Sequence, residues 1–148
     1  MSLEMALPGR ERARSMGWRR RTSVRIAVAS AHVASRLAPR RLESIARLLA
    51  VSARSSTRYE DAMRVHQHVV AVSPRCAGLR GCLPRSIAIA ILCRSEGTWP
   101  TWCIGVRRAP PFIAHAWIQS EGRLVGEPGS PDTYQPLVAV SHDAPRAR

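Results

Sequence analysis

Residues 82–93 have the sequence CLPRSIAIAILC, and this stretch decides the fold. Pro84 stands in the first turn of the expected helix, where the N–H that proline lacks would have no intrahelical partner in any case. The residues that follow are apolar nearly all round a helical wheel, with Ile87 and Ile91 one turn apart. The stretch therefore predicts a buried helix that begins near Cys82 and ends at Gly97.

After this helix the pattern changes from helical spacing to alternation, in which successive side chains point to opposite faces of a strand. It predicts three strands, at residues 101–106, 112–119 and 123–125. Residues 120–122, Ser-Glu-Gly, form a tight turn between the last two. These two strands are therefore expected to pair antiparallel.

Two amphipathic helices are expected before the buried one. The first starts at Pro39, and its apolar stripe consists of Leu42, Ile45, Leu48 and Leu49. The second starts with a capping box, in which Thr57 and Glu60 each satisfy a backbone N–H at the helix start. Its buried face consists of Ala62, Val65, Val69 and Val72. Pro74 ends this second helix.

Helices followed by an antiparallel sheet define an α+β fold. A chain of 148 residues is long enough for one domain with its own core. We expect a flexible arginine-rich tail at residues 1–22, a single domain at residues 23–137 and a C-terminal tail at residues 138–148. Every uncharged apolar stretch falls far short of the ~20 residues that a membrane-spanning helix needs, which excludes a transmembrane protein.

The chain is strongly basic, with a net charge of +13, and all 23 of its basic residues are arginine. Residues 1–60 hold 13 arginines against four acidic residues, so the excess lies in the N-terminal part. Such a charge attracts polyanions or acidic peptides. A nucleic acid is unlikely as the main ligand, because Trp18 and Tyr59 are the only aromatic residues in that part that bases could stack on.

The arginine run at residues 19–21 resembles a twin-arginine export signal, but the following segment argues against export. Residues 23–34 are interrupted by Arg25 and His32, so their apolar stretch is too short and too polar for a signal core. We therefore expect a cytoplasmic protein.

The four cysteines, at positions 76, 82, 93 and 103, have neither the spacing of a zinc site nor the context of a disulfide framework. No metal and no cofactor is expected. Cys93 and Cys103 are surrounded by apolar residues and are expected to be small buried hydrophobes. Cys82 differs because it lies at a helix N-terminus, where the helix dipole favours the thiolate that a nucleophile needs.

A thiol nucleophile needs an imidazole, and His115 is the best placed of the five histidines. It lies on a predicted strand with Ile113 and Trp117 on the same face. Taken alone, these apolar neighbours favour the interpretation of His115 as a core histidine over a catalytic one. A third group is needed to hold the imidazole, and the residues leave Glu127 and Asp132 as alternatives.

Several spaced motifs occur in one order along the chain. They are CLPRSIA (82–88), LCR (92–94), GTWPTWCIGV (97–106), PFIAHAW (111–117) and EGRLVGEP (121–128). Together they resemble the lasso-peptide leader peptidases, which are transglutaminase-like cysteine proteases of lasso-peptide gene clusters, here most similar to the actinobacterial type. The resemblance covers about residues 37–137.

This resemblance implies a papain-like or transglutaminase-like core with Cys82 as nucleophile and His115 as general base. It implies Glu127 as the third member, at a position where the best-known family pattern has Asp, and Asp132 is kept as the alternative. The family removes the leader from a ribosomally made precursor peptide. The freed N-terminus of the core is then closed into a macrolactam by a separate asparagine-synthetase-like cyclase.

Some relatives carry their own leader-recognition domain, for which the 81 residues before Cys82 offer too little room. The resemblance therefore implies a separate small recognition protein that delivers the precursor. Two other functions remain open. The same Cys82 and His115 pair serves a transglutaminase that transfers the acyl group to an amine, and a basic binding module would use neither residue chemically.

Overall fold

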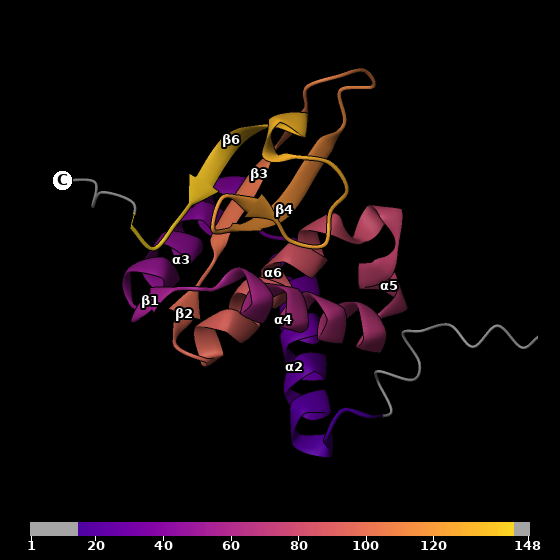
Figure 1. The fold of residues 1–148 in the computed structure, drawn as a ribbon, viewed down its shortest axis with the longest axis vertical. Helices are drawn as coiled ribbons and strands as arrows, with labels where there is room; N and C mark the ends of the chain where they lie inside the picture. Colours follow the sequence, from indigo (N-terminus) through magenta and orange to yellow (C-terminus); the bar gives the residue numbers. More distant parts are fainter. Residues whose placement is uncertain (1–14, 144–148) are drawn as a thin grey trace, which may run out of the picture.

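The computed structural model describes residues 15–143, and its helices precede its main sheet (Figure 1). The helices are α2 (Trp18–Ala34), α3 (Pro39–Val51), α4 (Tyr59–Val72), α5 (Pro74–Ala77) and α6 (Cys82–Ser95), with short 3-10 turns η1 (Leu79–Gly81) and η2 (Pro131–Thr133). The strands are β1 (Ser55–Ser56), β2 (Thr98–Trp99), β3 (Thr101–Arg107), β4 (Ala114–Ser120), β5 (Arg123–Leu124) and β6 (Tyr134–Val140). The predicted α+β class is confirmed.

Helix α6 lies at the centre of the molecule, between the other helices and the sheet (Figure 1). It contacts α2, α4 and β4, and most of its residues are buried on every side. Trp102 of β3 anchors the sheet on it, because its indole N–H donates a hydrogen bond of 3.1 Å to the Ser86 hydroxyl of α6. The buried helix predicted from Cys82 is confirmed. The position of α6 places its first residue, Cys82, beside the sheet.

The main sheet has four antiparallel strands in the order β5-β4-β3-β6. The predicted tight turn joins β4 to β5, with φ of 51° at Glu121 and 71° at Gly122. Strand β6 was not predicted, since the chain from residue 138 was expected to be a tail. It pairs with β3 instead, and Val140 is buried at its end. Residues 144–148 of the predicted tail lie outside the described residues.

Helix α2 also corrects the prediction, because it begins at Trp18 and residues 18–22 are helical rather than part of a flexible tail. Arg19, Arg21 and Arg25 are exposed, outside a narrow buried stripe. That stripe consists of small residues, Val24, Ala27 and Ala31. A stripe of one valine and two alanines gives a weak hydrophobic pattern, although it packs closely on α6. Residues 1–14 of the predicted tail lie outside the described residues.

The apolar stripe predicted for α3 is partly wrong. Leu42 is buried, but Ile45 and Leu48 are exposed, and the buried face continues instead through Ala46 and Ala50. These residues follow a spacing of four, whereas the prediction followed the largest apolar side chains. Small residues allow α3 to approach the core closely.

The capping box predicted at the start of α4 does not form. Arg58 is the N-cap residue and offers no side-chain cap. The Thr57 hydroxyl instead bonds the Thr98 hydroxyl at 2.8 Å. The Glu121 carboxylate accepts the backbone N–H of Tyr59 at 3.0 Å, so the turn between β4 and β5 supplies the cap. A tertiary contact has replaced a local one.

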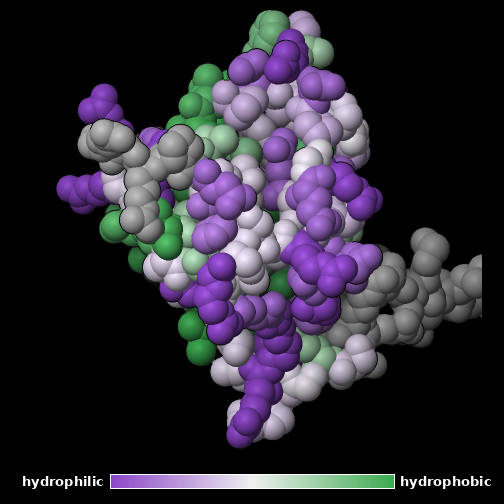
Figure 2. All heavy atoms as spheres, turned by 60° about the vertical axis from the view of Figure 1, so that its left-hand side comes forward, coloured by the Kyte–Doolittle hydropathy of each residue, from purple (hydrophilic) through white to green (hydrophobic). Residues whose placement is uncertain are grey.

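Hydrophilic side chains cover much of the face seen in Figure 2, and hydrophobic ones gather along one margin. Exposed apolar residues of the molecule include Ile45, Leu48 and Leu137. Within residues 15–143, no helix combines the length and the apolar character that crossing a membrane requires.

Candidate active site

Cys82 is the first residue of α6 and is half-buried. The chain reaches it through α5 and η1, which pack tightly against each other. A Cβ at Gly81 would collide with the Arg75 carbonyl oxygen and lie 2.9 Å from the Cys76 Cα. Only glycine therefore fits before Cys82, and this close approach holds the thiol at the helix N-terminus.

His115 on β4 forms a hydrogen bond with the Cys82 thiol. This bond lowers the pKa of the thiol; burial opposes the change, and backbone N–H groups at Ala116 and Leu83 add to the lowering. The same bond is the main cause that raises the pKa of His115 to about 9. Both shifts are in the direction that favours the pair of a Cys82 thiolate and a His115 imidazolium.

Aromatic rings fix the orientation of the His115 imidazole. It stacks on Tyr134 with ring centroids 4.9 Å apart and on Trp117 with centroids 6.1 Å apart. Tyr134 in turn stacks on Trp117 at 5.0 Å. The three rings form a stack on the face of the sheet turned away from the main core, as the alternation of β4 predicted for His115 and Trp117. Tyr134 was missed because β6 was missed.

Glu127 lies on the other side of the imidazole. One carboxylate oxygen is 3.2 Å from Nε2 of His115, which leaves Nδ1 for the thiol. Burial raises the pKa of the Glu127 carboxyl, but hydrogen bonds and charge from His115 and Arg85 outweigh it and bring the pKa below its usual value. The contact between the Glu127 carboxylate and Nε2 of His115 is an ion pair when the imidazole is protonated.

Asp132, the alternative third member, lies exposed on η2. Among the ion pairs of residues 15–143, Glu127 is the acid that contacts His115, and none joins Asp132 to the imidazole. The structure thus brings together Cys82, His115 and Glu127 in the order thiol, imidazole, carboxylate, and leaves Asp132 apart. This order is that of a cysteine nucleophile, its base and the group that orients the base.

Arg85 is a residue of the site that sequence reasoning missed. Its guanidinium bonds the Glu127 carboxylate at 2.7 Å and the Cys76 carbonyl oxygen at 2.7 Å. Both side chains of the ion pair are nearly buried, with 12% of Arg85 and 9% of Glu127 exposed. The pair therefore ties the acid to the segment that leads into Cys82. Its sequence signal was its place one turn after Cys82 on the same helix.

His66 on α4 supports the loop that carries Glu127. A Cβ at Gly126 would collide with the His66 ring, and φ of Gly126 is 69°. Burial lowers the pKa of His66, and the Arg85 charge adds to this lowering, so the ring is neutral at pH 7. The close contact between His66 and Gly126 thus positions the loop that carries Glu127 beside the His115 imidazole.

A groove of about 1040 Å³ runs past the imidazole and the acid. His115 and Glu127 line it together with His66 and Tyr134. Ile113 and Leu79 also line it and are largely exposed, so the groove offers apolar contacts on both sides.

The remaining cysteines differ sharply from Cys82. Cys93 and Cys103 are each 1% exposed, and burial raises the pKa of both thiols to about 12. The prediction that both are buried hydrophobes is confirmed. Within residues 15–143, no group of three or more His, Cys, Asp or Glu side chains is arranged to hold a metal ion.

Comparison with known families places this site in a class. The family model described as the transglutaminase-like superfamily matches residues 24–139, so the chain belongs to that superfamily. The match includes the helix that carries Cys82 and the strand that carries His115. No curated protein and no solved structure matches the chain significantly. Membership supports cysteine-dependent proteolysis or acyl transfer, both of which pass through an acyl group on the cysteine.

Proposed function

We propose that this protein is a cysteine peptidase that removes the leader from a ribosomally made lasso precursor peptide. The cut frees the N-terminus of the core peptide for macrolactam formation by a partner cyclase. The proposal assigns the catalytic roles to Cys82, His115 and Glu127. It combines the superfamily with the motif resemblance at residues 82–128.

The observation that carries the proposal is the hydrogen bond between Cys82 and His115, with Glu127 3.2 Å from the other imidazole nitrogen. These residues lie on a helix, a strand and a loop far apart in sequence. A core histidine and a core cysteine have no need of this order or of an ionised acid behind the ring. The opposite pKa shifts of thiol and imidazole match what a nucleophile and its acid require.

In the first step, the Cys82 sulfur attacks the carbonyl carbon at the junction of leader and core. The electron pair of the carbonyl moves to oxygen, next to the N-terminus of α6, where the helix dipole favours negative charge. The C–N bond then breaks, and His115 gives its proton to the departing amine, which is the N-terminus of the core. The leader remains as a thioester on Cys82.

In the second step, the neutral His115 takes a proton from a water molecule, which attacks the thioester carbonyl. The C–S bond breaks, the leader leaves with a new carboxyl terminus, and His115 is again protonated beside the thiolate. The Glu127 carboxylate stays ionised throughout. It holds the ring orientation and stabilises the imidazolium, while Arg85 fixes the carboxylate.

The proposed partners follow from the resemblance. They are the precursor peptide, a separate small protein that recognises its leader, and an asparagine-synthetase-like cyclase. The groove beside His115 is open at the surface, which suits a peptide substrate brought to it by another protein.

The test uses the full chain with the precursor peptide and recognition protein encoded beside its gene, read by mass spectrometry. Wild type is expected to give a leader fragment and a core fragment that together equal the precursor plus one water. Cys82→Ala and His115→Ala are expected to leave the precursor whole, with a loss of roughly 10³-fold or more. Cys93→Ala, which removes a buried thiol of the main core, should still cleave. Cleavage by Cys82→Ala would overturn the proposal.

Acyl transfer is the second candidate, because the superfamily supports it and the thioester step is identical. With an amine as acceptor, the leader product would carry the mass of that amine in place of water. The same mass spectra therefore separate the two activities. A basic binding module predicts no product in either form.

A further inference from the structure

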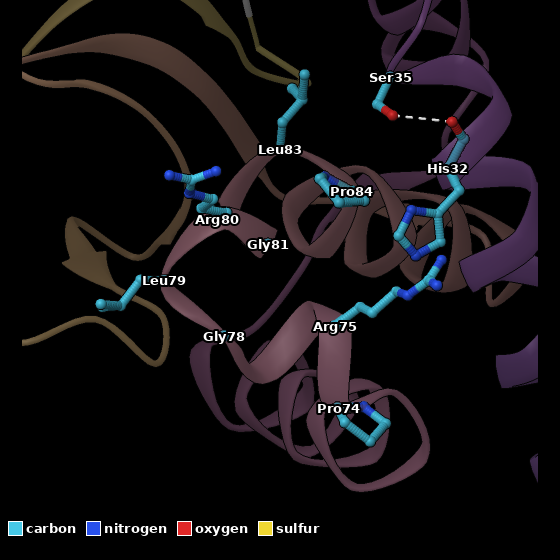
Figure 3. A pocket seen from close by; sticks show the side chains of 10 residues that line it. All are labelled: His32, Ser35, Pro74, Arg75, Gly78, Leu79, Arg80, Gly81, Leu83 and Pro84. Carbon is cyan, nitrogen blue, oxygen red and sulfur yellow. Dashed lines mark hydrogen bonds between the residues drawn. The ribbon is translucent and has the colours of Figure 1, made fainter.

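A second hollow is lined by the residues directly before and after Cys82 in the sequence, Gly81 and Leu83 (Figure 3). It is lined by residues of α2, α5, η1 and the first turn of α6, including Gly81, Leu83 and Pro84 around the nucleophile. Residues 78–80 line both this hollow and the groove beside His115. The two cavities therefore share the segment that leads into Cys82.

The second hollow is basic. Arg75, Arg80 and His32 line it, and none of its lining residues is acidic. Figure 3 shows the Arg75 side chain extending toward the His32 ring, while Arg80 lies on the opposite side near Leu83. Among the ion pairs of residues 15–143, none involves Arg75 or Arg80. Both guanidinium groups are therefore available to a carboxylate from outside.

The groove beside His115 also has more basic than acidic lining residues. Its arginines are Arg80, Arg85 and Arg107, and its one acidic lining residue, Glu127, is already bound to Arg85 and His115. No carboxylate of the groove is left to pair with a basic side chain of a bound peptide. The charge around the nucleophile thus selects against basic peptides and for acidic ones.

The chemistry of cleavage assigns a direction to the substrate. The departing amine must receive its proton from His115, so the part of the peptide after the cut bond lies in the groove that His115 lines. The part before the cut bond then runs across residues 78–81 to the second hollow. This step rests on the function proposed above.

We propose that the hollow formed by Arg75, Arg80 and His32 binds an acidic side chain of the substrate peptide on the N-terminal side of the cut bond. The ligand class is a peptide carboxylate, from Asp or Glu. Arg75 and Arg80 are both exposed, so solvent screens each contact. Removing both arginines is expected to weaken binding about five- to tenfold, and the effect should shrink as salt is added.

The first test measures binding without turnover. The Cys82→Ala protein is titrated with two fluorescein-labelled 12-residue peptides that differ only in four consecutive Glu or Gln residues. The Glu peptide is expected to bind at least tenfold more tightly. Adding Arg75→Gln and Arg80→Gln should weaken its binding about five- to tenfold. The control, Arg40→Gln with Arg41→Gln, removes the same charge from exposed residues of α3 that do not line the hollow.

If the control lowers binding as much as the Arg75 and Arg80 variant, only the overall charge of +13 attracts the peptide, and the inference is wrong. Equal binding of the Glu and Gln peptides also overturns it. This test does not depend on catalysis, so its failure is distinguishable from failure of the proposed function.

The second test uses cleavage to check the direction. Wild type is incubated with the gene-encoded precursor carrying either one added Glu or one added Gln, placed two to four residues before or after the cut bond. The Glu placed before the bond should raise kcat/KM about threefold over its Gln counterpart, and Arg80→Gln should abolish this difference. An effect seen only for Glu placed after the bond would contradict the assigned direction.

Discussion

The contact between Cys82 and His115 lowers the pKa of the thiol and raises that of the imidazole, although burial opposes both changes. Backbone N–H groups stabilise the sulfur, and Glu127 stabilises the imidazolium. The sequence allowed this thiol and this imidazole to be selected, because one begins an apolar helix and the other interrupts an apolar strand. It left Glu127 and Asp132 open, because the loop between β5 and β6 has no periodicity that would place either side chain.

The pH dependence of cleavage follows from these charges. Activity needs the Cys82 thiolate, so it rises with pH through the lowered pKa of that thiol. It also needs the His115 proton, so it falls as pH passes the raised pKa of about 9. In Glu127→Gln a cause of the raised pKa is gone, and the falling limb should move to lower pH. Cleavage should decrease about 10²–10⁴-fold, as in other triads that lose their acid.

Asp132→Asn is the matched control, because it removes an exposed carboxylate at the alternative position. Its pH profile and rate of precursor cleavage should equal those of wild type. A profile that shifts in Asp132→Asn and stays unchanged in Glu127→Gln would show that the third member has been assigned to the wrong acid.

At the level of the elements, the helix that carries the nucleophile and the hairpin that carries the base were predictable. Residues 82–95 are apolar on all sides, and the turn at Glu121 and Gly122 has a distinct signature. The start of α4 was not predictable. The sequence pattern of Thr57 and Glu60 indicates a local cap, but in the structure Glu121, from a distant turn, caps the helix instead. Strand β6 was missed since Pro136 and a short alternation concealed it. Tertiary pairing, rather than local preference, decided both elements.

The contact of η1 with α5 predicts the effect of a single methyl group. In Gly81→Ala the added Cβ meets backbone atoms of Arg75 and Cys76, which cannot rotate away. We expect a loss of about 1–3 kcal/mol in the free energy of unfolding, measured in urea, and a clear decrease in cleavage as Cys82 shifts. Gly78→Ala, whose Cβ would lie at an ordinary 3.5 Å from the Arg75 oxygen, should be close to wild type. Equal stability of the two variants would contradict this packing.

On the scale of the whole molecule, α2 and the sheet enclose α6 from two sides. The order of helices and strands was evident from the sequence, and the extent of the domain was not. Residues 18–22 and 138–140 belong to folded elements, α2 and β6. The prediction left them out because small buried residues and an edge strand give weak sequence patterns. Stripes of alanine are hard to recognise, although they permit the closest helix packing.

Packing of α2 predicts a contrast between two alanines. Ala27 is buried, and Ala29, two residues later on the same helix, is exposed. Ala27→Glu places an unpaired carboxylate in the core and should cost about 3 kcal/mol or more of the free energy of unfolding. Ala29→Glu should change it by about 0.5 kcal/mol or less. Thermal or urea unfolding of both variants checks this, and a stable Ala27→Glu protein would show that α2 does not belong to the core.

The ion pair of Cys82 and His115 can be measured directly, without a substrate, as the rate at which chloroacetamide alkylates Cys82 at each pH, read from its peptide by mass spectrometry. We predict that Cys82 reacts well below the pKa of an ordinary thiol, with a further change near pH 9, while the buried Cys93 and Cys103 stay unmodified. In His115→Ala the low-pH reactivity should disappear. A single step at the ordinary thiol pKa, the same in wild type and in His115→Ala, would contradict the account.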